Sequence, residues 1–145
     1  MPALPPVARD VLMLAARLLL GAVLLAHGWQ KLIGDGLGVT SVGFARLGVP
    51  LPMLSAGFAG CVETGGGLLF VAGLLTPIAG VLVTFLMLSA GWFAGDWFGG
   101  VTGPGGWELV GVIMAGALLL AAAGPGRFSL DHVLAARRVP IAAGR

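Results

Sequence analysis

The sequence predicts an all-α, polytopic membrane protein folded as a four-helix bundle, and two observations lead to this fold class. Apolar residues make up 58% of the 145 residues, only 10% are charged, and the mean hydropathy is +1.03. Soluble domains carry about 25% charged residues, so water is not the main solvent of this chain. The apolar residues also form four separate runs, each close to the roughly 20 residues that a helix needs to cross a bilayer.

The four helices use most of the chain, so we predict a single domain over residues 1–145. Their expected bounds, followed by a cytoplasmic tail, are 11–29, 51–75, 77–93, 107–123 and 124–145. Pro77 suits the first turn of a helix, so Leu75-Thr76-Pro77 indicates a very tight connection. The second and third helices are therefore expected to be neighbours.

The 26 glycines lie mostly among Leu, Val and Ala, which argues against disorder. Small residues let membrane helices approach closely. We assign this packing role to Gly21 and Gly28 on the first helix and to Gly66 on the second.

The connecting segments carry their own signals. Residues 31–52 form a weakly amphipathic stretch, in which we expect a turn or two lying on the membrane surface. After the fourth helix, Gly124, Pro125 and Gly126 predict a stop and a turn. Ser129 or Asp131 is then placed to cap a short tail helix over residues 132–138.

The distribution of basic residues predicts the orientation of the bundle. Five arginines flank the side of the two termini, against Lys31 and Arg46 on the other side; they are Arg9, Arg127, Arg137, Arg138 and Arg145. The positive-inside rule then puts both termini in the cytoplasm. The formal net charge of +2 comes from few charges in total, so we predict no nucleic-acid role.

Two charged residues fall inside apolar runs, where an unpaired charge costs several kcal/mol. Arg17 is 12 residues from Trp29 and Glu63 is 12 residues from Leu51, which puts both about 18 Å from the outer face at 1.5 Å per residue. We therefore expect Arg17 and Glu63 to pair. A structural ion pair is the favoured reading, and a proton relay or a substrate contact stays open as the alternative.

One face of the first helix is expected to point into the bundle, because its members recur at helical spacing: Arg17, Gly21, Leu24, Gly28 and Lys31. His27 lies beside this face, and Asp96 and Glu108 belong to the same outer end of the bundle. These groups predict a polar pocket that opens outward.

Each of these polar residues also has a simpler explanation. Lys31 can extend to the headgroups, and Glu108 suits the first turn of a helix. His27 is equally well explained as a proton carrier or as a histidine satisfied by a backbone carbonyl. Because the only histidines are His27 and His132, no metal site is predicted, haem ligation between helices is not expected, and no cofactor is evident.

Several motifs together resemble the DoxX family of bacterial membrane proteins. They are Arg17, HGWQKL at 27–32, GVPLP, ETGGGLLFVAGLLTPIAG and GPGRFSLD. The resemblance extends from about Arg17 to Asp131, and it implies a four-helix protein of the bacterial cytoplasmic (inner) membrane. The positions that match the family pattern, without chemical roles attached, are Arg17, His27, Gly28, Lys31, Glu63, Gly66 and Asp131.

The resemblance also implies a relation to thiosulfate:quinone oxidoreductase and to thiol and oxidative-stress redox complexes. The leading hypothesis is accordingly a membrane subunit that contacts quinone near Arg17, His27 and Glu63, while soluble redox partner proteins transfer electrons. Whether the chain is an enzyme stays open, and no catalytic residue is assigned. The alternatives are a small-molecule or proton-coupled carrier, expected to work as a homo-oligomer, and a non-enzymatic scaffold in the lipid bilayer.

Overall fold

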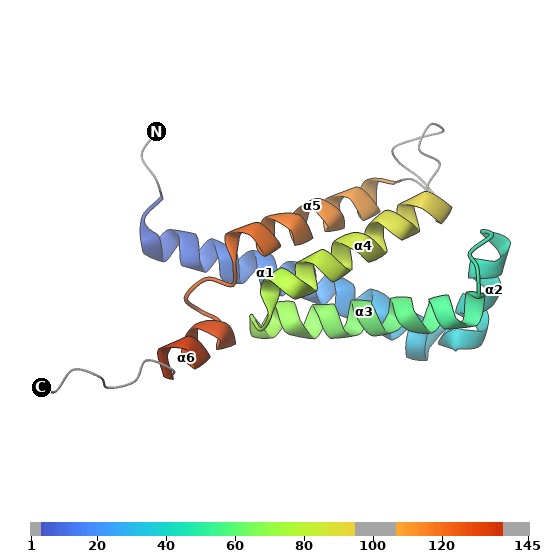
Figure 1. The fold of residues 1–145 in the computed structure, drawn as a ribbon, viewed down its shortest axis with the longest axis horizontal. Coiled ribbons are helices and arrows are strands. Elements are labelled where there is room, and N and C mark those ends of the chain that lie inside the picture. The colour runs from blue at the N-terminus through green and yellow to red at the C-terminus, as the bar shows by residue number, and fades with distance from the viewer. Residues whose placement is uncertain (1–3, 95–106, 138–145) are drawn as a thin grey trace, which may run out of the picture.

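The computed structural model describes residues 4–94 and 107–137. Within these ranges the chain is all-helical, with six α-helices and one short π-helix (Figure 1). In order they are α1 (Pro6–Trp29), η1 (Gln30–Gly34), α2 (Gly36–Arg46), α3 (Pro52–Ala72), α4 (Thr76–Ala94), α5 (Glu108–Ala123) and α6 (Leu130–Arg137).

Three of the helices are long and apolar enough to cross a membrane. They are α1 together with η1 (Pro6–Gly34), α3 (Pro52–Ala72) and most of α4 (Thr76–Phe93). The fourth predicted span, α5, is apolar but has 16 residues, which extend about 24 Å against a bilayer core of about 30 Å. The described residues thus define a multi-pass membrane protein with three candidate spans and a shorter apolar helix.

The predicted tight connection between the second and third spans is confirmed. Gly73 ends α3 in the left-handed conformation with φ 66°, and Leu75 follows with φ 49°. The α-helix resumes at Thr76, with Pro77 in its first turn. Glycine takes such a conformation without steric cost, so α3 turns directly into α4 and the two helices are in contact.

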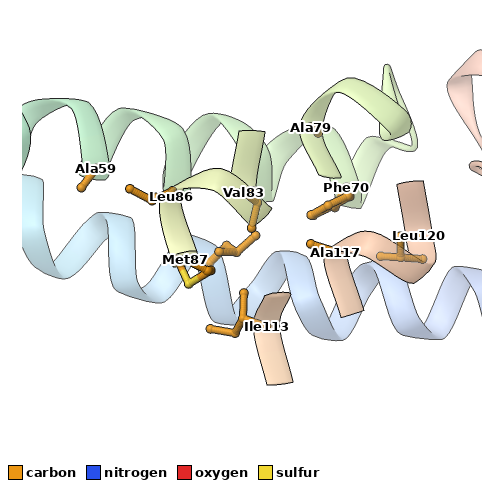
Figure 2. Packing of buried hydrophobic residues seen from close by; sticks show 10 residues of the cluster. Ala59, Phe70, Ala79, Val83, Leu86, Met87, Ile113, Ala117 and Leu120 are labelled. Carbon is orange, nitrogen blue, oxygen red and sulfur yellow. The ribbon is translucent and has the colours of Figure 1, made fainter. Parts of the chain in front are cut away.

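The long helices form two pairs: α1 lies along α3, and α4 lies along α5. In Figure 1 the pairs meet near the turn between α3 and α4 and diverge toward α2. Figure 2 shows the core where they meet, with Phe70 of α3, Val83 of α4 and Ala117 of α5 fully buried. The other ends of the pairs are consequently farther apart.

Glycines bring α1 and α3 close together. A Cβ atom on Gly21 would lie 2.9 Å from the backbone oxygen of Gly67, and a Cβ atom on Gly67 would lie 2.9 Å from that of Gly21. A Cβ on Gly28 would lie 3.1 Å from the oxygen of Gly60. Gly66 faces α4 instead, where a Cβ atom would lie 2.8 Å from a methyl group of Val83. Each predicted packing glycine therefore sits where a side chain would collide with the next helix.

The segment after α1 differs from its prediction, because it forms an 11-residue helix, α2, in place of a turn or two. Its glycines at 36, 38 and 43 have low helix propensity. For this reason the sequence pattern did not predict a helix of this length. Packing compensates for them, since α2 contacts α3 and Phe44 joins the edge of the hydrophobic core.

Candidate functional site

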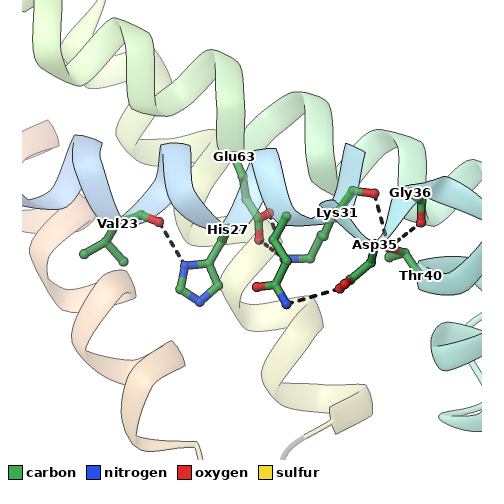
Figure 3. A network of polar contacts seen from close by, with 8 residues as sticks. Val23, His27, Lys31, Asp35, Gly36, Thr40 and Glu63 are labelled. Carbon is green, nitrogen blue, oxygen red and sulfur yellow. Dashed lines mark hydrogen bonds and ion pairs between the residues drawn. The ribbon is translucent and has the colours of Figure 1, made fainter. Parts of the chain in front are cut away.

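An ion pair joins α1 and α3 at the end of the bundle nearest α2. The Lys31 ammonium, carried by η1, lies 2.8 Å from each carboxylate oxygen of Glu63 on α3 (Figure 3). The two side chains keep only 22% and 6% of their exposure. An ammonium has three N–H donors, so this contact leaves one for another partner.

His27 lies one helical turn before Lys31, so the two side chains are neighbours on the helix surface. Its Nδ1 is 2.9 Å from the carbonyl oxygen of Val23. A carbonyl only accepts, so Nδ1 carries the hydrogen and Nε2 of the neutral ring is an acceptor. Among residues 4–94 and 107–137, no side chain or backbone group forms a hydrogen bond with Nε2. The prediction of a histidine held by a backbone carbonyl is confirmed for this one nitrogen.

A cavity of about 410 Å³ lies beside these three side chains, in the part of the bundle where the helix pairs diverge. His27, Lys31 and Glu63 all line it. The rest of its wall is almost entirely apolar and comes from α1 to α5 and the linker before α3; it includes Leu24, Phe44, Val49, Phe58, Leu86, Phe93 and Ile113.

Two serines also reach this wall, but their hydrogens are already used. The hydroxyl of Ser55 donates to the carbonyl of Pro50 at 2.7 Å, and that of Ser89 donates to Phe85 at 3.0 Å. The strongest polar groups that face the cavity are therefore the ion pair and the imidazole.

The predicted pairing of Arg17 with Glu63 is wrong. Arg17 is 1% exposed, and its two terminal nitrogens donate to the backbone carbonyls of Pro125 and Phe128, the second at 2.7 Å. No carboxylate of the described chain lies within ion-pair distance of it. The predicted inward face of α1 is nevertheless confirmed, since Arg17, Gly21, Leu24 and Gly28 are all buried.

The pairing failed because the helix register differs from the one assumed. Gly21 faces Gly67, so the residue of α3 level with Arg17 is Val71. Val71 is eight residues from Glu63, or about 12 Å along the helix. The helical segment also continues past Trp29 through η1, which shifts the reference point from which both depths were counted.

The Arg17 guanidinium instead fastens the segment after α5 to the bundle. It lies against Gly73, whose carbonyl accepts the N–H of Asp131 at 3.1 Å. Ser129 caps α6 as predicted, because its hydroxyl oxygen accepts the N–H of His132 at 3.2 Å. At the start of α1, the carboxylate of Asp10 accepts the N–H of Arg127 at 3.3 Å.

The other predicted polar residues lie away from the cavity. Glu108 is exposed in the first turn of α5 and does not line it, and Asp96 falls outside the described residues. Within the described part of the chain, no group of three potential ligands could hold a metal ion. The i, i+4 spacing of His27 and Lys31 was the signal in the sequence that could have paired them in one site.

The fold and the site define a class of protein: a multi-pass α-helical membrane protein with a mainly apolar, partly open cavity and an ion pair in its wall. The family model for DoxX matches residues 12–96. The chain belongs to the DoxX family.

Its relatives are membrane proteins by name. Inner membrane protein YphA of Escherichia coli is 39% identical over 133 residues, covering 86% of this chain and 91% of that protein. Uncharacterized membrane protein Rv3486 of Mycobacterium tuberculosis is 35% identical over 134 residues, covering 83% and 80%. Inner membrane protein YqjF of E. coli is 33% identical over 126 residues, covering 86% and 93%. No solved structure matches the chain with significance.

Proposed function

We propose that this chain is the membrane subunit of a redox complex and that it binds a quinone in the cavity beside Lys31 and Glu63. The observation that carries the proposal is the composition of the cavity wall, in which an ion pair and an imidazole interrupt an otherwise apolar surface. Soluble partner proteins would supply the electron-transfer groups.

The size and chemistry of the cavity support a small, largely apolar ligand. Ligand sites typically measure about 300–1,000 Å³ and combine apolar walls with a few polar groups. A quinone has apolar ring faces and carbonyl oxygens that accept hydrogen bonds. Lys31 has one N–H that Glu63 does not use, and this donor would hold a quinone carbonyl.

The quinone contacts assigned from the sequence change in one respect. Arg17 leaves the contact set, because its terminal nitrogens are hydrogen-bonded to backbone carbonyls and it does not line the cavity. Lys31 takes its place beside His27 and Glu63. The proposed ligand site thus lies wholly at the end of the bundle nearest α2.

The proposed topology has four crossings, with both termini in the cytoplasm of a bacterial inner membrane. In Figure 1 the start of α1 and the tail helix α6 lie at the same end of the bundle, and α2 lies at the opposite end. An even number of crossings produces that arrangement. Close packing of α5 on α4 supports a crossing by this shorter helix, since a Cβ atom on Gly80 would lie 2.6 Å from the oxygen of Ala117.

A binding titration with a cavity-filling variant tests the proposed ligand. The purified protein in detergent is titrated with a short-chain ubiquinone, and we expect saturable binding. Ala90 lines the cavity, so Ala90→Trp should weaken binding at least about tenfold, which corresponds to 1.4 kcal/mol. Leu88→Trp, on the exposed side of the same helix, is the matched control and should bind like the parent.

Absence of saturable binding by the parent protein would overturn the proposal. Uptake of a solute or of protons by reconstituted vesicles would then favour the carrier. A protein without either activity, recovered with partners through its tail, would favour the scaffold.

A further inference from the structure

The polar groups of the cavity wall differ in how many of their hydrogen-bonding positions are already used. Ser55 and Ser89 donate to backbone carbonyls, and Glu63 accepts two contacts from Lys31. One N–H of Lys31 remains to donate. Among the acceptors, the oxygens of Glu63 and of the two serines keep lone pairs beside the bonds that they already make, whereas the single lone pair of Nε2 of His27 has no partner among the described residues. The cavity therefore presents its occupant with one free donor and with one acceptor, Nε2 of His27, that makes no hydrogen bond within the described part of the chain.

The acceptor is fixed by the fold. Nδ1 of His27 is turned back to the carbonyl of Val23 in its own helix, so the neutral ring has a single tautomer. Figure 3 shows the ring beside the Val23 carbonyl that it contacts, on the same side of α1 as Lys31. Side chains at i and i+4 are about 5–6 Å apart at Cβ, so one polar head can reach both.

An oxidised quinone cannot satisfy both positions, because its carbonyl oxygens only accept. It would use the Lys31 donor and leave Nε2 without a partner in an apolar wall. An occupant that covers Nε2 without bonding to it removes its access to other partners, and covering a polar group in that way is costly. A ring hydroxyl, in contrast, donates to Nε2 while its oxygen accepts from Lys31.

We infer that the cavity selects a hydroxyl-bearing aromatic head, such as a hydroquinone, over the corresponding quinone, and that His27 is the specificity-determining residue. This inference rests on the proposed function. It adds to it the form of the ligand that the site holds more tightly.

The test compares the two redox forms of one ligand on one protein. A short-chain ubiquinol and the matching ubiquinone are titrated separately, without oxygen, and the ratio of their dissociation constants is measured. We expect the parent protein to bind the quinol about tenfold more tightly, the effect of one net hydrogen bond. A ratio near one would overturn the inference.

Two variants assign the preference to the imidazole. His27→Phe keeps a ring but removes this acceptor, so the ratio should fall toward one, chiefly through weaker quinol binding. His27→Gln keeps an amide oxygen that accepts, so it should retain part of the preference. Because each ratio is measured within one protein, a loss of folded material does not affect it, and an unchanged ratio in His27→Phe would contradict the role of His27.

The outcomes also separate this inference from the proposal on which it rests. If neither form binds to the parent, the proposed quinone site fails. If both forms bind equally well and Ala90→Trp weakens both, the site stands and only the selection by His27 fails.

Discussion

Each end of the bundle holds a cation that is fully or largely withdrawn from solvent, but the two ends satisfy it in different ways. Near the tail, Arg17 donates to two backbone carbonyls and is covered by the segment that precedes α6. Near α2, Lys31 is held by the carboxylate of Glu63 in the wall of a cavity.

This difference indicates where a ligand can act. Backbone carbonyls cannot move without unfolding the loop that carries them, so the Arg17 end is a closed structural contact. A carboxylate and an ammonium can exchange one partner for another, and those of Glu63 and Lys31 already line a cavity. A buried charge is therefore better evidence of function at the Lys31 end than at the Arg17 end.

The largest effect on stability is expected for Arg17→Ala, which removes the contacts of Arg17 with the segment before α6. Two hydrogen bonds from a charged group are lost, each contributing about 1.5–3 kcal/mol, so the free energy of unfolding should fall by about 4 kcal/mol. Chemical unfolding in mixed micelles measures this change. Ligand affinity of the folded protein should stay at the parental value.

Arg17→Lys is the matched variant for that experiment. It keeps the charge but not the planar fork that reaches two carbonyls, so an intermediate loss of stability is expected. If either variant bound ligand more weakly while keeping its stability, Arg17 would belong to the functional site. The two ends of the bundle would then not differ in the way described.

Glu63→Gln tests the functional end and should have the second-largest effect. Removing one member of a buried pair leaves the other charge without a partner, which should lower the free energy of unfolding by about 3 kcal/mol. In Lys31→Met/Glu63→Leu both charges are gone, and such replacements are often neutral, so the free energy of unfolding should recover to within about 1 kcal/mol of the parent. Saturable ligand binding should be lost in both proteins.

If the double variant recovers its stability but not its ligand binding, the ion pair contributes to binding the ligand. If the double variant instead bound ligand as the parent does, the ion pair would be structural, like the contacts of Arg17.

The smallest effect is expected at the interface that connects the two ends. In Gly21→Ala the new methyl group meets the backbone of Gly67, and overpacking of this kind costs about 1–3 kcal/mol. Gly65→Ala is the control, because nothing lies within 4 Å of a Cβ at that position. It should be neutral or stabilising by up to about 1 kcal/mol. Equal effects on unfolding would show that glycine does not set the distance between α1 and α3.

The sequence was sufficient for the helices and their inward faces, because hydropathy and helical spacing are local properties of the chain. The bounds of α3 to α5 follow the apolar runs closely, and the cap at Ser129 follows from its position before a helix. The match of the DoxX model to residues 12–96 confirms the family resemblance seen in the motifs.

The partners of the buried charges could not be predicted in the same way. The carbonyls that bind Arg17 come from residues 108 and 111 positions away and belong to a loop whose polar backbone is invisible in a hydropathy pattern. The pairing of Lys31 with Glu63 depends on the helix register, which the contact of Gly21 with Gly67 sets. The depths of Arg17 and Glu63, counted from assumed helix ends, could not predict the register that this contact sets.

The π-helical segment η1 changes the rotational position, around the helix axis, of the residues that follow it. The N–H of Asp35 bonds to the carbonyl of Gln30 at 2.8 Å, five residues back, so this turn holds one residue more than an α-helical hydrogen bond would enclose. One residue corresponds to a rotation of about 100° around the helix axis. The extra residue thus rotates the point at which the chain leaves the helix, just before Gly36, whose φ of 77° ends the helical run and lets α2 start in a new direction. A single-residue deletion in this turn would restore the α-helical phase and rotate the direction in which α2 leaves by about 100°, which would carry Phe44 out of its place in the cavity wall.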